Sequence, residues 1–216
     1  VPSGGAEKPL EKVVLALKWQ HQFQFAGYYA AVKQGYYAGE GLDVELITPQ
    51  DNVYAVEAVL SGRAQYGVTA ADLVHARTSG KPVVALAAIF QHSPIMLLSR
   101  RDRNLVYLAD YIGKTVMCDE DDVLEIKAMF LKEGIDPSLI HFVPHRWSVE
   151  PLIQGEVDAS VDYITNEPFQ LRFRGINPRI IQPIDYGIDF YGDTLFTTET
   201  EVRQHPERAE AFRRAS

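Results

Sequence analysis

Apolar and polar positions follow two rhythms that succeed each other along this chain. Short runs rich in β-branched residues have the two-residue period of a strand, and between them apolar residues recur every three or four positions, as on one face of a helix. The first half of the pattern predicts strands at 13–17, 43–47, 65–70 and 82–90, with helices at 25–37, 53–60 and 71–78. Strands that alternate with helices indicate a mainly parallel sheet covered on both faces.

The same alternation begins again after Arg103. It predicts strands at 113–118, 139–144, 158–163, 178–184 and 193–198, helices at 122–133 and 149–154, and two helical segments after the last strand. Two successive α/β units joined by long strands near 85–99 and 183–197 predict two lobes between which the chain crosses twice. We place the first lobe at 1–93 and 194–216, and the second at 94–193. The last helical pattern stops in mid-repeat, so we expect the first lobe to continue beyond Ser216.

Composition narrows the class of protein. Hydrophobic residues make up 46% of the 216 positions, as in a globular chain with buried cores. The 29 acidic and 21 basic residues give a formal charge of −8, which argues against nucleic-acid binding, because that requires clustered Lys and Arg. No apolar run reaches the roughly 20 residues of a membrane helix. The single cysteine, Cys118, rules out an internal disulfide and is compatible with the cytoplasm or a periplasm.

Polar and aromatic residues gather where the predicted strands end. Ligands of open α/β sheets bind beyond the carboxyl ends of the strands. The segments at these ends are 19–24, 69–70, 91–93, 118–122 and 163–167. They combine aromatic, amide and hydroxyl side chains with some carboxylates. This set suits a neutral or weakly basic aromatic small molecule that is held by ring stacking and a few hydrogen bonds.

The candidate ligand contacts come from these segments and from the second crossing. They are Trp19, Gln22, Phe25, Tyr28, Thr69, Ala70, His92, Asp119, Tyr163, Asn166, Glu167, Tyr186 and Tyr191. Trp19 and Tyr163 would stack on a ring, while Asn166 and Glu167 would read ring nitrogens and an amino group. Structural roles compete with these: Phe25 begins a predicted helix and could belong to the core, and Asn166 could cap a helix that has a proline in its first turn.

Two further segments allow more than one interpretation. The carboxylates at 119–122 are of the type that hard cations prefer, but their spacing fits no known cation loop, and their position before a helix favours capping. The backbone N–H groups of Thr69 and Ala70 could serve a ligand or a helix terminus. The sequence contains no Ser-His-Asp set, phosphate loop or zinc spacing. It therefore predicts a binding protein with no metal or cofactor rather than an enzyme.

The segment at 17–46, LKWQHQFQFAGYYAAVKQGYYAGEGLDVEL, resembles the opening of the NMT1/THI5-like proteins, periplasmic solute-binding proteins linked to thiamine-pyrimidine precursors. Similar motifs follow in order: VLSGRAQYGVTAADLVHARTSGKPVVALAAIFQHSP, GEVDASVDYITNEP and YGIDFYGDTLFTTE. The resemblance covers nearly the whole chain. It implies the α/β type II periplasmic-binding-protein fold, an extracytoplasmic location, and two lobes that close over a pyrimidine-like heteroaromatic solute.

The same family has an enzyme branch, which makes the thiamine pyrimidine from pyridoxal phosphate and one of its own histidines. That branch carries a Schiff-base lysine in the segment that resembles YGVTAADL, with a histidine a few residues later. Here the lysine position holds Thr69, and the histidine position falls at Asp72 or Leu73. The branch's cysteine cluster would fall at 188–194, where this sequence has no cysteine. The synthase alternative is therefore disfavoured.

The resemblance implies two kinds of partner. One is the permease of an ABC importer. The other is a fused transmembrane signalling module, such as a histidine kinase or a diguanylate cyclase. The variants HQFQFAGYYAA and YGIDFYGDTLF resemble the receptor-fused members more, so we expect a sensory input domain.

Overall fold

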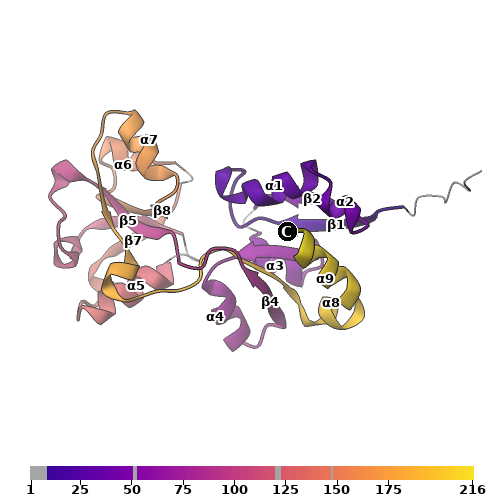
Figure 1. Ribbon diagram of the computed structural model, residues 1–216. Helices are drawn as coiled ribbons and strands as arrows, with labels where there is room; N and C mark the ends of the chain where they lie inside the picture. The colour runs from indigo at the N-terminus through magenta and orange to yellow at the C-terminus, as the bar shows by residue number, and fades with distance from the viewer. Residues whose placement is uncertain (1–8, 51–52, 120–122, 147) are drawn as a thin grey trace, which may run out of the picture. The chain divides into compact units, whose positions relative to one another are not determined.

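The chain folds into two compact units. The computed structural model describes residues 9–50, 53–119, 123–146 and 148–216 (Figure 1). The first unit comprises the described residues up to Thr69, then Leu73–Ile89 and Asp193–Ser216, and the second comprises Ala70–Asp72 and Phe90–Gly192. The boundaries expected from the sequence lay after residues 93 and 193, whereas the main changes of unit fall after Ile89 and Gly192.

The sheet of the first unit has five strands in the order β2-β1-β3-β10-β4. Their bounds are β1 Glu11–Ala16, β2 Leu42–Ile47, β3 Tyr66–Thr69, β4 Val83–Ala88 and β10 Thr194–Thr198. β1 is parallel to β2 and β3, and β10 runs antiparallel between β3 and β4. Leu15 packs in the core on one face and Ala16 in the core on the other. Burial on both faces explains the unbroken apolar run of β1.

Helices cover both faces of this sheet (Figure 1). On one face lie α1 Ala26–Lys33, α2 Tyr36–Gly39 and α9 Pro206–Ala215, and on the other lie α3 Ala55–Leu60 and α4 Asp72–Thr78. The short 3-10 helix η1 Phe23–Phe25 leads into α1, and α8 Glu199–Gln204 follows β10. The single helix predicted over 25–37 is divided, because Gly35 has a φ of 76° and its left-handed backbone ends α1.

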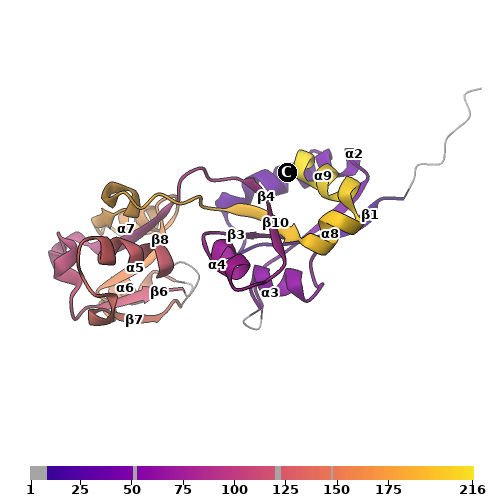
Figure 2. The same cartoon turned by 90° about the horizontal axis from the view of Figure 1, so that it is seen from below.

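The carboxyl-terminal helix α9 is fixed to the first unit by aromatic stacking. The Phe212 ring lies 3.8 Å from the Tyr66 ring, centroid to centroid, and 5.1 Å from the Tyr37 ring. Figures 1 and 2 both show α9 beside α2, the helix that carries Tyr37. The Tyr66 hydroxyl donates to the Glu201 carboxylate at 2.8 Å, so the polar end of that ring is also satisfied.

The second unit repeats the same sheet topology. Its strands are β5 Ile95–Arg100, β6 Thr115–Cys118, β7 His141–Pro144, β8 Ala159–Tyr163 and β9 Pro178–Ile181, in the order β7-β6-β8-β5-β9. β6 is parallel to β7 and β8, and β5 runs antiparallel between β8 and β9. In both units the antiparallel strand is the first strand after a crossing. Both sheets are therefore mixed, with one strand reversed in a mainly parallel set.

Helices cover both faces of the second sheet as well. Figure 1 shows α6 Glu150–Gln154 and α7 Glu167–Phe173 on one side and α5 Val123–Lys132 on the other. The connections contain the 3-10 helices η2 Arg101–Arg103, η3 Leu108–Tyr111, η4 Pro137–Leu139 and η5 Pro183–Tyr186. Each face has its own buried apolar cluster, one around Phe130 of α5 and one around Leu152 and Leu171.

The crossings are not the long strands that the sequence predicted. The predicted strand at 178–184 ends at Ile181, and Pro183 begins η5 instead, because proline has no N–H for a sheet ladder. The next strand begins only at Thr194. The two crossing segments hydrogen-bond to each other: Ile89 N–H donates to the Asp193 carbonyl at 2.8 Å, and Gly192 N–H to the Phe90 carbonyl at 2.9 Å.

Candidate functional site

In the second unit, three parallel strands bring polar residues to one edge of the sheet. Asp119 follows β6, His145 follows β7, and Tyr163 ends β8, a few residues before α7 begins at Glu167. Carboxyl ends of parallel strands share one edge, where ligands of such sheets bind. The sequence selected four residues of this edge: Asp119, Tyr163, Asn166 and Glu167.

Glu167 is a buried carboxyl group at this edge. Its two oxygens accept hydrogen bonds from the Tyr163 backbone N–H at 3.1 Å and from the Asn166 side-chain amide at 2.7 Å. Burial, and then the charge of Asp162, raise the pKa of Glu167 from 4.5 to about 7. Near neutral pH this carboxyl group can therefore donate or accept a hydrogen bond.

Asp162 anchors a second polar group at the same strand end. Ser160 and Asp162 share one face of β8, because they are two residues apart, and the serine hydroxyl donates to the carboxylate. The Asp162 carboxylate also lies 3.1 Å from His145 Nε2. Burial lowers the pKa of His145, but the hydrogen bond and charge of Asp162, with the charges of Asp119 and Glu167, outweigh that effect and raise it. Among the described residues, this edge thus brings His145 together with the carboxyl groups of Asp119, Asp162 and Glu167.

A second candidate region lies on the crossing segments within the second unit. His92 Nδ1 is 2.9 Å from the Asp189 carboxylate, and both side chains are largely exposed. A hollow of about 570 Å³ opens there, lined by Gln91, His92, Asp189, Phe190 and Tyr191. It brings together two predicted contacts, His92 and Tyr191. Tyr186 lies apart from it and packs against the apolar cluster around Phe130.

In the first unit, the segment that leads into α1 is hydrogen-bonded to the residue that precedes β10. The Gln22 side-chain amide donates to the Gln24 side-chain oxygen, and the Gln24 amide donates to the Asp193 carboxylate at 3.2 Å. Asp193 is 1% exposed, and Lys18, two residues after β1, is 5% exposed. Buried charges at a strand end mark a polar site rather than an apolar core.

Two of the aromatic residues that were predicted to contact a ligand, Phe25 at the end of η1 and Tyr28 in α1, are buried. Phe25 has no exposed surface and packs in the core of the first unit, so the structure favours its structural role over the predicted contact. Tyr28 is also buried, but its hydroxyl has no hydrogen-bond partner among the described residues. Burial and the charge of Asp193 raise the pKa of Tyr28, so this hydroxyl remains a protonated donor. Trp19 is partly buried against the same core.

At the end of β3 a backbone N–H group is used in the turn that leads into α4. The Ala70 N–H donates to the Asp72 side chain at 2.8 Å, which is the helix-terminus use expected as the alternative to a ligand contact. Thr69 and Ala70 are both buried. Of the acidic segment 119–122, for which capping was favoured over a cation site, residues 120–122 lie outside the described residues. Among those described, no group of three or more His, Cys, Asp or Glu residues is placed to hold a metal ion.

Residues 22–216 match the family model described as NMT1/THI5 like. This chain belongs to the NMT1/THI5-like family. A formylaminopyrimidine-binding protein of Halalkalibacterium halodurans is 29% identical over 97% of the chain and 66% of its own length. The riboflavin-binding protein RibY of Chloroflexus aurantiacus is 25% identical over the whole chain and 63% of its own length. The chain thus spans about two thirds of the length of these curated relatives.

Solved structures show the fold. A protein from Bordetella bronchiseptica aligns with a TM-score of 0.77 at 21% identity over 94% of the chain and 69% of its own. The alkanesulfonate-binding protein SsuA of Xanthomonas axonopodis pv. citri aligns with a TM-score of 0.69 at 13% identity over 96% of the chain and 72% of its own. The two mixed five-stranded sheets have the type II periplasmic-binding-protein fold, as the resemblance implied.

One of the chain's more distant relatives is an enzyme. The 4-amino-5-hydroxymethyl-2-methylpyrimidine phosphate synthase of Schizosaccharomyces pombe is 20% identical over 94% of the chain and 63% of its own length. Pyridoxal phosphate does not fit the position implied by the resemblance, because Thr69 stands there, is 1% exposed and has no amine. The two more similar relatives above are binding proteins. In the described part of the chain, no helix is long and apolar enough to cross a membrane.

Several residues of these edges were not selected from the sequence. Asp193 and Lys18 were missed, and so were Ser160, Asp162 and His145. The alternation in DASVDY carries a signal for two of them, because it puts Ser160 and Asp162 on one face of a strand that is otherwise apolar. His145 had no such signal, since its contact with Asp162 depends on how β7 and β8 end at the same edge.

Proposed function

We propose that this chain is a solute-binding domain for a small heteroaromatic molecule of the pyrimidine type, and that Glu167 and Asn166 recognise its polar edge. The observation that carries the proposal is the buried Glu167 carboxyl group, with its pKa raised to about 7, at the carboxyl edge of the second sheet. The pyrimidine- and flavin-binding relatives support the ligand class.

The chemistry of an aminopyrimidine suits such a group. Its ring nitrogen accepts a hydrogen bond, and the neighbouring amino group donates one. A protonated carboxyl group offers the matching donor and acceptor side by side. Asn166, whose amide already donates to Glu167, holds the carboxyl group in one orientation. In the first unit, Trp19 stays a predicted stacking residue.

Calorimetric titration tests the proposal with formylaminopyrimidine, the hydroxymethylpyrimidine precursor and riboflavin as separate ligands. Glu167→Leu removes both hydrogen-bonding atoms, and we expect it to weaken pyrimidine binding by about 30-fold, since each of the two hydrogen bonds between neutral groups contributes roughly 1 kcal/mol. Glu167→Gln keeps a donor beside an acceptor and should bind within about tenfold of the wild type. Glu156→Leu, at an exposed residue of the same unit, is the matched control.

The outcomes separate the ligand classes. Saturable binding of a pyrimidine that is lost in Glu167→Leu but kept in Glu156→Leu supports the proposal. Binding of riboflavin but of neither pyrimidine would contradict a pyrimidine ligand and indicate a flavin instead. No binding of any of the three, or equal binding by both leucine variants, contradicts the role of Glu167.

We also propose an extracytoplasmic location and a membrane partner. Two further structural relatives are described as the periplasmic binding protein of a putative sulfonate ABC transporter and the ligand-binding component of an ABC-type import system, and these names support an ABC permease. The motif variants at 21–31 and 186–196 support a fused signalling module. The complete coding sequence tests this. A membrane helix followed by a kinase or cyclase module would support the receptor, and neighbouring permease genes without such a module would support transport.

A further inference from the structure

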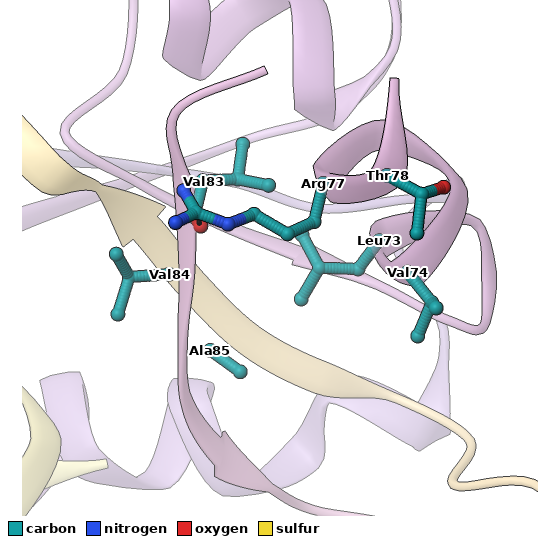
Figure 3. Close-up of a pocket in the computed structure, with 7 residues that line it drawn as sticks. All are labelled: Leu73, Val74, Arg77, Thr78, Val83, Val84 and Ala85. Carbon is teal, nitrogen blue, oxygen red and sulfur yellow. Dashed lines mark hydrogen bonds between the residues drawn. The ribbon is translucent and has the colours of Figure 1, made fainter. Parts of the chain in front are cut away.

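Two surface hollows, one in each unit, combine apolar side chains with an arginine. Figure 3 shows the hollow of the first unit, which measures about 390 Å³ and lies between α4 and β4. Its Arg77 pairs with Glu199 and lies 3.5 Å from the Val83 carbonyl, so this arginine is engaged within the unit. The hollow of the second unit measures about 330 Å³ and is lined by Val149, Asn166, Phe169, Gln170, Phe173 and Arg174. This second hollow lies on α7, beside aromatic rings that are exposed.

Two phenylalanine rings of α7 are exposed side by side. Phe169 and Phe173 are four residues apart, so they share one face of the helix, and their exposed fractions are 59% and 96%. The Arg172 guanidinium group lies over the Phe169 ring, 5.4 Å from its centroid. A single exposed apolar side chain is common, but adjacent ones mark a surface that another molecule or a membrane covers.

A second arginine-rich segment lies beside the end of α7. The Arg101 N–H, in η2, donates to the Asn177 carbonyl at 2.9 Å, which joins η2 to the turn after α7. The short helix α6 contacts both segments, because its Glu150 pairs with Arg174 at 2.8 Å and its Ile153 carbonyl accepts from Arg100 at 2.6 Å. The sequences RRDR at 100–103 and RFR at 172–174 are far apart in the chain, and the fold brings them to one face of the second unit.

This face has an excess of positive charge. Its arginines are Arg100, Arg101, Arg103, Arg172 and Arg174. Asp102 pairs with Arg100 at 2.6 Å, and Glu150 pairs with Arg174. Within the described ranges, the other three arginines form no ion pair, and all three are exposed. Salt screens charges that are more than about 8 to 10 Å away, so the local excess acts even though the formal charge of the chain is −8.

We infer that this face of the second unit, formed by α7 and η2, binds a membrane surface that contains anionic phospholipids. Guanidinium groups bind phosphate oxygens through paired hydrogen bonds, and the two phenylalanine rings enter the headgroup layer between them. A headgroup layer adapts to an almost fully exposed ring such as Phe173, whereas a folded protein would need a pocket of matching shape. Binding is weak and reversible, because few apolar groups take part. The inference depends neither on the solute nor on the membrane partner proposed above.

Sedimentation with sucrose-loaded vesicles tests the inference with the chain 1–216. The vesicles contain equal parts of phosphatidylglycerol and phosphatidylcholine, and the control vesicles contain phosphatidylcholine alone. We expect about fivefold or greater preference for the anionic vesicles. Raising the ionic strength from about 0.1 M to about 1 M should remove most of this binding, because the Debye length falls to about 3 Å.

An arginine double variant tests the charge. Arg101→Gln combined with Arg172→Gln should weaken binding to the anionic vesicles by about tenfold. Arg63→Gln combined with Arg213→Gln is the matched control, because it changes the net charge equally at exposed residues of the first unit, and it should bind like the wild type.

A phenylalanine variant tests the apolar part. Phe173→Ala should weaken binding by about three- to fivefold, since it removes the more exposed ring. Phe23→Ala is its control, because Phe23 is 90% exposed in the first unit and should not take part. Melting temperatures equal to that of the wild type show that all four variants are folded.

The outcomes decide between a lipid surface and its alternatives. Preference for the anionic vesicles that is lost in the arginine variant and reduced in Phe173→Ala, but kept in both controls, supports the inference. No binding to the anionic vesicles, equal binding to phosphatidylcholine alone, or equal losses in a variant and its control overturns it. Binding to polyglutamate but not to the vesicles would assign this face to an acidic protein and also overturn the lipid surface.

Discussion

The buried carboxyl group of Glu167 links the stability of the fold to pH. Its pKa is raised from 4.5 to about 7, mainly by burial and then by the charge of Asp162. Between these two values the folded protein holds the proton that the unfolded chain has lost. The stabilisation is therefore fully present below pH 4.5, and it is lost as the pH rises through about 7.

Urea unfolding at pH 5 and pH 8 measures this link. We expect the wild type to lose roughly 2 to 3 kcal/mol more unfolding free energy between the two values than Glu167→Gln, which has no proton to release. Glu156→Gln, at an exposed carboxylate, should follow the wild type. Equal pH dependence in the wild type and Glu167→Gln would contradict the raised pKa.

At Gly67 the absence of a side chain lets Phe196 and Val59 pack directly against the backbone of β3. A Cβ atom built at Gly67 would lie 2.5 Å from ring atoms of Phe196 and 3.0 Å from Val59. Gly67→Ala should therefore cost about 1 to 3 kcal/mol of unfolding free energy, because the core is overpacked. At Gly27, in α1, nothing lies within 4 Å of such an atom. Gly27→Ala should stabilise by about 0.5 to 1 kcal/mol, and thermal unfolding compares the two variants.

At the scale of the element, α9 places one aromatic side chain, Phe212, against Tyr66 and Tyr37 of the first unit. Phe212→Ala removes the ring that stacks on Tyr66 and Tyr37, and we expect it to destabilise the first unit by about 3 to 5 kcal/mol. Phe173→Ala is the control, because Phe173 is 96% exposed and should change stability by less than about 0.5 kcal/mol. Equal losses in denaturant unfolding would mean that the stacking of Phe212 does not stabilise the unit.

Helices and strands that bury one or both faces could be predicted from the spacing of their apolar residues, but the residues at which they end could not. The runs around β1 and α5 match the prediction, because burial on a sheet face or a helix face imposes its own period. The end of α1 at Gly35 and the early end of β9 each depend on a single residue. The spacing of apolar residues continues across both positions, so it does not reveal these ends. The crossings were predicted as strands for this reason.

The candidate site was predicted in part for a similar reason. Asn166 and Glu167 were found because they follow a strand, and strand ends are visible in the sequence. The contact between His145 and Asp162 joins residues of two different strands, and the burial of Lys18 depends on the completed unit. Neither has a local signature.

At the scale of the whole molecule, the two units differ in whether one continuous segment of the chain contains all the strands of their sheet. The second sheet is complete within the continuous segment 90–192, whereas the first needs β10, which comes after that segment and lies between β3 and β4. We therefore expect the fragment 90–192 to unfold cooperatively on its own. The fragment 1–89, which lacks β10, should show no cooperative transition. Circular dichroism on heating compares the two, and a cooperative 1–89 would contradict this view.

The place of β10 in the first sheet also has a consequence for a chain that grows from its amino terminus. In the folded sheet β10 lies between β3 and β4. Until residue 198 has been made, the growing chain therefore lacks the strand that pairs with both of them. The half that is synthesised first is thus the half that finishes last, and its apolar strands stay exposed while the second unit folds. We therefore expect a chaperone that binds exposed apolar segments to bind the first unit during synthesis more than the second.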